Sequence, residues 1–189
     1  MNQKLIEVEY QNAKNTPSDI NEHIEVLYAY AKRCKHITEM GVRTVVSTWA
    51  FLKADPDKYF GIDMFEHPNM NTAKIAGGDK VEFTIVDVLE WEIDPTDFLF
   101  IDTFHTATQL EKELAKHADK AKKYIGFHDT FTFWEKGEQP YEGMGGKGVD
   151  CGRGLKYALE PFLKANPHWT IAYKTDRNNG LTIIQRKAQ

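Results

Sequence analysis

The chain has 189 residues and a formal net charge of −4, and hydrophobic residues make up 41% of it. This length suits one domain with a single core. The small negative charge excludes a general attraction to nucleic acid or to an anionic membrane surface. We therefore expect neither as a partner. We treat residues 1–189 as one domain, with an N-terminal helical extension over 1–35 and an α/β core over 36–189.

The sequence also indicates a reducing compartment. Cys34 and Cys151 lie far apart without the spacing of a metal site, so two free thiols are expected. The first ten residues mix charged and apolar side chains, unlike a secretory signal. No apolar run is long enough to span a bilayer. These features predict a cytoplasmic protein.

The first helix is predicted to begin in the Thr-Pro-Ser-Asp segment at residues 16–19. Thr16 is a suitable N-cap and Pro17 fits the first helical position. Apolar residues then recur at helical spacing as far as Ala31, so one face of the helix should be buried. We expect this helix to end near Cys34.

After the first helix, strand and helix patterns alternate. The expected strands are residues 37–40, 59–63, 81–86, 98–101, 123–127, 169–174 and 181–185. The expected helices are a segment running from Gly41 through Leu52, then residues 70–76, 107–118 and 154–165. The last two strands flank Asn178, Asn179 and Gly180, which suit a hairpin turn. The pattern predicts a doubly wound, Rossmann-like α/β fold. Its mostly parallel sheet has about seven strands and ends in an antiparallel hairpin.

Acidic residues or histidine follow five successive strands of this predicted sheet. They are Glu39, Asp63, Asp87, Asp102, and the pair His128 and Asp129. Acidic residues are depleted within strands. Ligands of open α/β sheets bind outside the carboxyl ends of the strands, where the strand order reverses. The spaced set therefore predicts a ligand site at that edge.

The first strand ends favour a nucleoside cofactor. Gly41 has no Cβ, so the backbone there can approach a ligand closely. Asp63 lies about twenty residues further on, where an acid can accept hydrogen bonds from ribose hydroxyls. The chain lacks the G-x-G-x-x-G pattern, which favours a cofactor without a pyrophosphate over NAD. Asp87 could then accept from an adenine amino group. The alternative is that Asp63 and Asp87 only cap turns or helices.

Several segments match a known pattern in order and spacing. Residues 39–48 fit E-x-G-x-x-x-x-x-S-T, residues 101–105 fit I-D-x-x-H, and residues 127–130 are F-H-D-T. With the closing helix and hairpin over residues 154–182, they resemble class I S-adenosylmethionine-dependent methyltransferases. The likeness is greatest to a small bacterial and phage branch. The resemblance covers roughly residues 36–186.

The resemblance implies a set of site residues. It implies contacts to S-adenosylmethionine from Glu39, Gly41, Ser47, Asp63 and Asp87. It also implies a substrate or metal region made of Asp102, His105, His128 and Asp129. The sequence departs from the family at residues 43–46, Arg-Thr-Val-Val, where relatives often carry more glycine. Bulkier side chains there are expected to narrow the cofactor pocket.

Three roles remain open for the last group of residues. Asp102, His128 and Asp129 could bind Mg²⁺ or another divalent ion, which would lower the pKa of a bound hydroxyl. Alternatively, His128 or His105 could act as a general base without a metal. The third role is structural, with His105 capping the helix that starts near Thr106.

The sequence therefore predicts a methyltransferase that acts on a small-molecule or sugar-type acceptor, at oxygen. The alternatives are a metal-dependent hydrolase or hydroxylase on the same fold, and a non-catalytic cofactor-binding module.

The long segment 130–151, with Phe131, Phe133 and Trp134, is predicted to be a lid over the acceptor. The edge hairpin and the first helix could each support a homodimer.

Overall fold

The structure, a computed structural model, describes residues 1–140 and 152–187, and within them one seven-stranded sheet with the order β3-β2-β1-β4-β5-β7-β6. The strands are β1 (His36–Met40), β2 (Lys58–Asp63), β3 (Val81–Ile85), β4 (Thr96–Ile101), β5 (Ala121–His128), β6 (Trp169–Thr175) and β7 (Leu181–Arg186). The first five are parallel, and β7 pairs antiparallel with both β5 and β6. The predicted Rossmann-like sheet with its closing hairpin is confirmed.

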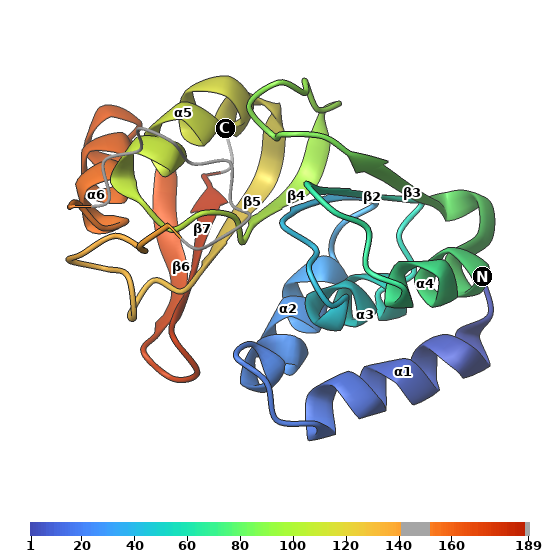
Figure 1. Cartoon of the computed structure of the whole chain (residues 1–189). Coiled ribbons are helices and arrows are strands. Elements are labelled where there is room, and N and C mark those ends of the chain that lie inside the picture. The colour runs from blue at the N-terminus through green and yellow to red at the C-terminus, as the bar shows by residue number, and fades with distance from the viewer. Residues whose placement is uncertain (141–151, 188–189) are drawn as a thin grey trace.

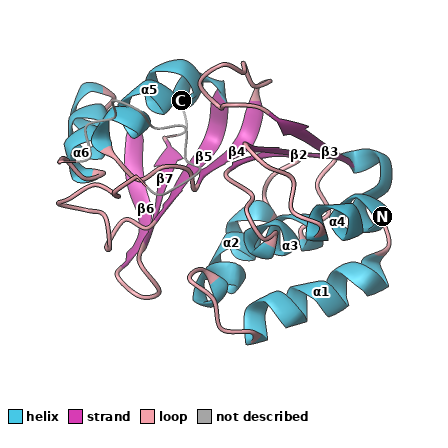
Figure 2. Cartoon of the chain, viewed as in Figure 1, coloured by secondary structure: helices cyan, strands magenta, loops and turns pink. Residues whose placement is uncertain are grey.

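Helices cover both faces of this sheet (Figure 2). One face carries α2 (Ile24–Ala31), α3 (Val46–Lys53) and α4 (Asn69–Gly77), and the other carries α5 (Ala107–His117) and α6 (Lys156–Ala165). Short 3-10 turns occupy Asn21–His23, Gly78–Lys80 and Ala118–Lys120. A separate hydrophobic cluster fills each side. None of the helices in the described ranges has both the length and the apolar character that a bilayer crossing requires.

A further helix, α1 (Gln3–Asn15), lies outside α2, α3 and α4 as an additional layer (Figure 1). Asn2 caps it by accepting a hydrogen bond from the backbone N–H of Leu5 at 3.2 Å. Ile6 and Tyr10 are buried in the same cluster as α3 and the sheet. The ammonium of Lys53 lies 3.7 Å from the centre of the Tyr10 ring, which adds a cation–π contact. The N-terminal residues thus belong to the core packing.

The predicted start of the first helix is wrong, whereas its buried face and its end near Cys34 are confirmed by α2. Thr16 is the C-cap of α1, with an extended backbone, and α2 begins only at Ile24. The cause is local hydrogen bonding. Ser18 and Asn21 exchange bonds, since each side chain accepts from the other's backbone N–H at 2.9–3.0 Å. Such bonds compete with a helix, so the segment between the two helices is a loop.

Truncating Ile6 to alanine should lower the free energy of unfolding by about 2–4 kcal/mol, because the variant leaves a cavity between α1 and the core. Ile6 is 0% exposed, whereas Val8 on the same helix is 50% exposed. Val8→Ala is therefore the matched control, and it should change stability by no more than about 0.5 kcal/mol. Urea denaturation of the two variants measures the difference. Equal stability would show that α1 is not part of the cooperative core.

Candidate functional site

The loops that follow β1 and β4 meet at Gly41. Gly41 has a φ of +83°, and a Cβ built there would lie 1.9 Å from the carbonyl oxygen of Asp102. The N–H of Asp102 in turn donates to the carbonyl of Met40 at 2.8 Å. Only glycine permits this approach. Since β1 and β4 are the neighbours at which the strand order reverses, the contact lies where open α/β sheets bind ligands.

Asp63, at the end of β2, forms hydrogen bonds with the backbone of the loop after β1. Its Oδ2 accepts hydrogen bonds from the backbone N–H groups of Val42 and Arg43, at 2.8 Å and 2.7 Å. Asp87 follows β3 and accepts from the N–H of Leu89 at 2.8 Å. Both carboxyl groups are half-buried at the same edge. A carboxylate offers about four acceptor positions, so each retains capacity for a ligand hydroxyl or amino group.

Glu39 and Ser47 lie beneath this loop. The Glu39 carboxylate is completely buried and accepts hydrogen bonds from the hydroxyls of Ser47, Thr48 and Tyr59. Burial raises the pKa of Glu39 to about 7, although the three hydroxyls oppose that shift. These bonds tie β1 to the first turn of α3 and to β2. The structure thus places two of the predicted cofactor residues in the support of the loop.

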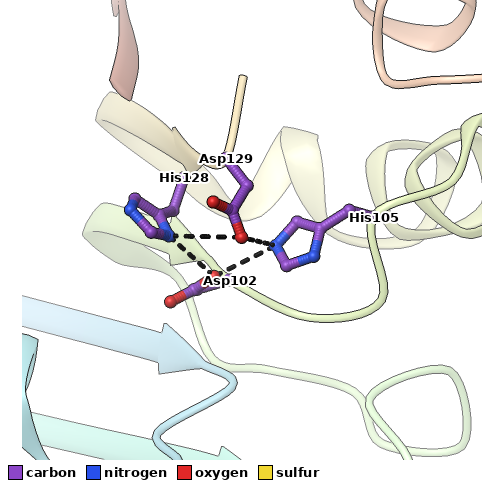
Figure 3. A group of neighbouring side chains, drawn as sticks. All are labelled: Asp102, His105, His128 and Asp129. Atoms are coloured by element: carbon purple, nitrogen blue, oxygen red, sulfur yellow. Dashed lines mark hydrogen bonds and ion pairs between the residues drawn. The ribbon is translucent and has the colours of Figure 1, made fainter. Parts of the chain in front are cut away.

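Asp102, His105, His128 and Asp129, here called the tetrad, converge at one point beyond the ends of β4 and β5 (Figure 3). The Nε2 of His105 lies 3.1 Å from Asp102 Oδ1 and 3.2 Å from Asp129 Oδ2. The Nδ1 of His128 lies 3.2 Å and 3.7 Å from the same two oxygens. One potential ligand atom of each residue lies within 4.8 Å of the other three. Four residues from two separate sequence segments therefore form one compact cluster.

The tetrad pairs positive imidazoles with negative carboxylates. Burial alone would lower the pKa of His105, but hydrogen bonds to Asp102 and Glu138 and the charge of Asp129 raise it to about 10. The pKa of His128 is also raised, because the charge of Asp102 outweighs burial. Burial would raise the pKa of Asp102, yet the two histidines hold it well below its usual range. Burial raises the pKa of the fourth member, Asp129, against the lowering effect of the two imidazoles.

Glu138 is a site residue that the sequence did not reveal. Its Oε2 lies 2.9 Å from Nδ1 of His105 and also accepts from the His105 backbone N–H at 3.2 Å. It lies 33 residues further along the chain. A single glutamate in an irregular segment carries no periodicity or motif, so only the folded chain brings it to the histidine.

The proposed capping role of His105 is wrong. Thr106 is the N-cap of α5, and its hydroxyl accepts from the N–H of Gln109 at 3.2 Å. The His105 side chain instead points toward the other three tetrad residues. Its ring stacks on Phe133, with the centroids 5.1 Å apart and an interplanar angle of 11°.

Phe133 belongs to the segment that we predicted to be a lid. Residues 141–151 of that lid, with Cys151, lie outside the described residues, while Cys34 is a buried free thiol.

A cavity of about 320 Å³ opens between the segment that follows β5 and the end of β6. Because β6 runs parallel to β5, its carboxyl end lies at the same edge of the sheet. The lining residues are Thr130, Phe131, Trp134, Lys174, Thr175 and Asp176. Thr130 directly follows Asp129, and the ammonium of Lys174 lies 4.2 Å from the centre of the Trp134 ring. The cavity thus combines aromatic faces with polar groups, and one of its lining residues is the chain neighbour of Asp129.

No protein-family model and no curated protein matches the chain. Solved structures share its fold. A protein from Corynebacterium glutamicum has a TM-score of 0.69 and 11% identity, covering 98% of this chain and 91% of that one. A Podospora anserina methyltransferase with S-adenosylhomocysteine bound has a TM-score of 0.63 and 15% identity. The match covers 97% of this chain and 88% of that one.

A third match is the 1,6-didemethyltoxoflavin-N1-methyltransferase of Burkholderia thailandensis, solved with 1,6-didemethyltoxoflavin and S-adenosylhomocysteine bound. Its TM-score is 0.65 at 13% identity, and the match covers 98% of this chain and 87% of that one. Identities this low show the fold alone. The chain has the Rossmann-like fold of these methyltransferases, and its place in a particular branch stays a prediction.

Replacing Gly41 by alanine should lower the free energy of unfolding by at least about 2 kcal/mol. The left-handed backbone costs about 1–2 kcal/mol for a residue with a Cβ, and the collision with Asp102 adds about 1–3 kcal/mol. Thr44→Ala, at an exposed position of the same loop, is the control and should change stability by less than about 0.5 kcal/mol. Chemical denaturation measures both. A Gly41→Ala variant as stable as the control would refute the close approach.

Proposed function

We propose that the chain is an S-adenosylmethionine-dependent methyltransferase that acts on a hydroxyl of a small-molecule or sugar-type acceptor. One observation carries the proposal. Asp102 belongs to both halves of the site, because its backbone touches Gly41 while its side chain joins the tetrad. A donor bound over the Gly41 loop would therefore lie next to the tetrad. Such proximity is what an in-line group transfer requires.

The residues on the donor side fit S-adenosylmethionine. The absence of a side chain at Gly41 lets its backbone approach that of Asp102. The donor would therefore lie over the joined ends of β1 and β4. Asp63 would accept hydrogen bonds from the ribose hydroxyls, and Asp87, one strand further along the edge, from the adenine amino group. Glu39 and Ser47 act from beneath by fixing the loop.

The tetrad fits a divalent metal ion. Two imidazoles among the ligands suit Zn²⁺ or Mn²⁺ better than Mg²⁺, which prefers oxygen ligands. Glu138 bonds the outer nitrogen of His105, as carboxylates commonly do for histidines that bind metals. A bound ion would lower the pKa of an acceptor hydroxyl. In the metal-free alternative, a His105 with a pKa of about 10 would be protonated at neutral pH and could not act as the base, which leaves His128 for that role.

The cavity beside Thr130 is our candidate for the acceptor pocket. Its volume of about 320 Å³ falls at the lower end of the range for small-molecule sites. Phe131 and Trp134 offer flat apolar faces, and Thr175 and Lys174 offer hydrogen-bond donors. Thr130, which lines the cavity, directly follows Asp129, so an acceptor held there would lie one residue along the chain from the tetrad.

Calorimetry should detect binding of S-adenosylmethionine and S-adenosylhomocysteine, and Asp63→Asn should weaken both by about tenfold or more. A neutral side chain loses charge-assisted bonds to the ribose and to the loop. Asp79→Asn, an exposed acid at the opposite edge of the sheet, is the control and should bind like the wild type. No binding to folded protein would contradict the proposal and favour a metal-dependent hydrolase or hydroxylase. Binding without turnover on any acceptor would favour the non-catalytic module.

Metal affinity should rise with pH. His105, with a pKa of about 10, carries a proton at neutral pH, and the pKa of His128 is also raised, so a metal must compete with protons for these imidazoles. Each displaced proton should increase the apparent affinity by about tenfold per pH unit below the imidazole pKa. Titration with Mn²⁺ in two buffers of different ionisation enthalpy measures the protons released.

His128→Ala should abolish this metal binding. His36→Ala, at the other end of β1, should leave it intact. An affinity that does not change with pH, or binding that survives His128→Ala, would show that the ion does not occupy the tetrad.

A further inference from the structure

The loop after β1 keeps the backbone of a glycine-rich loop although only one of its residues, Gly41, is a glycine. Positive φ angles recur at every second residue, +83° at Gly41, 45° at Arg43 and 73° at Val45. Left-handed backbone is unfavourable for residues with a Cβ, and most of all for a β-branched residue such as valine. Strain of this kind persists where the surrounding structure holds it, often at a functional site. A side chain at position 43 is therefore energetically unfavourable for the loop, which suggests that Arg43 has a function there.

The guanidinium of Arg43 forms an ion pair beside the loop. Its Nη1 lies 2.5 Å from Oδ2 of Asp19, while 71% of the side chain remains exposed. Burial lowers the pKa of Arg43, but the charges of Asp19, Asp102 and Asp129 raise it. Within residues 1–140 and 152–187, Asp19 is its only ion-pair partner. A guanidinium has five N–H donors, so most of them are free to bind a ligand.

Asp19 is itself held in place. The backbone carbonyls of Ser18 and Asp19 accept hydrogen bonds from the side-chain amides of Asn178 and Asn179, at 2.9 Å and 3.2 Å. His23, at the end of the same segment, lies 3.0 Å from the carbonyl of Asn178 through its Nε2. These contacts join the N-terminal segment to the β6–β7 turn. They fix the partner that orients Arg43.

The order of the strands assigns a ligand group to Arg43. Along the edge, Asp87 and Asp63 follow β3 and β2, the Gly41 loop follows β1, and the tetrad follows β4 and β5. A donor with its nucleoside at the two acids and its methyl group toward the tetrad has its amino-acid part over the loop between them. This placement rests on the proposed function.

We propose that Arg43 binds the α-carboxylate of S-adenosylmethionine. A guanidinium can hold a carboxylate through two parallel hydrogen bonds, and it does so better than a lysine ammonium. Asp19 orients the guanidinium before the donor arrives. Arg43, at a position where relatives often carry glycine, would thus determine which donor the site accepts.

The test compares S-adenosylmethionine with decarboxylated S-adenosylmethionine, which lacks only the carboxylate. Calorimetry should show that the wild type binds the complete donor about tenfold or more tightly. Arg43→Met should abolish this preference by weakening only the complete donor, and Arg43→Lys should retain part of it. Arg33→Met, before the start of β1, is the control and should keep the full preference. Thermal melting verifies that the variants are folded.

Three results would overturn the assignment. Equal weakening of both ligands by Arg43→Met would mean that Arg43 supports the loop and does not contact the carboxylate. An unchanged preference in that variant would mean that the carboxylate binds elsewhere. A wild type that binds neither ligand would contradict the proposed function itself, and this assignment with it, so the two failures are distinguishable.

Discussion

The close contact between Gly41 and the backbone of Asp102 is the constraint on which the carboxyl edge of the sheet depends. It brings the loops after β1 and β4 together with no room for a side chain between them. Because Asp102 also supplies a carboxylate to the tetrad, the same contact sets the position of the tetrad relative to the loop. A displacement of one loop would move both halves of the site.

The loop after β1 is held from two sides by carboxylates. Asp63 accepts from two of its backbone N–H groups at the edge, and the buried Glu39 binds three hydroxyls below it. Buried carboxylates are costly unless hydrogen bonds compensate for lost hydration. Here the hydroxyls of Ser47, Thr48 and Tyr59 supply that compensation. The arrangement maintains a strained, glycine-like backbone through residues that are not glycine.

Much of the fold and the tetrad could be predicted because their signals are local. Apolar runs that end in an acid or histidine mark β2, β4 and β5, and parallel strands bring those ends to one edge. The N-terminal helices could not be placed correctly, since the bonds between Ser18 and Asn21 act against the helical pattern of Thr16 and Pro17. Glu138 and the pair of Asp19 with Arg43 depend on contacts between distant segments. No motif or periodicity in the sequence reports such contacts.

In the proposed enzyme, one edge of the sheet holds the methyl donor and presents it to the tetrad. A crystal structure of the protein with S-adenosylhomocysteine would show whether it does. We expect the adenosine to lie against Asp63 and Asp87, and the sulfur to face the tetrad across Asp102. A ligand bound away from this edge, or one whose sulfur faces away from His105 and His128, would contradict the proposal.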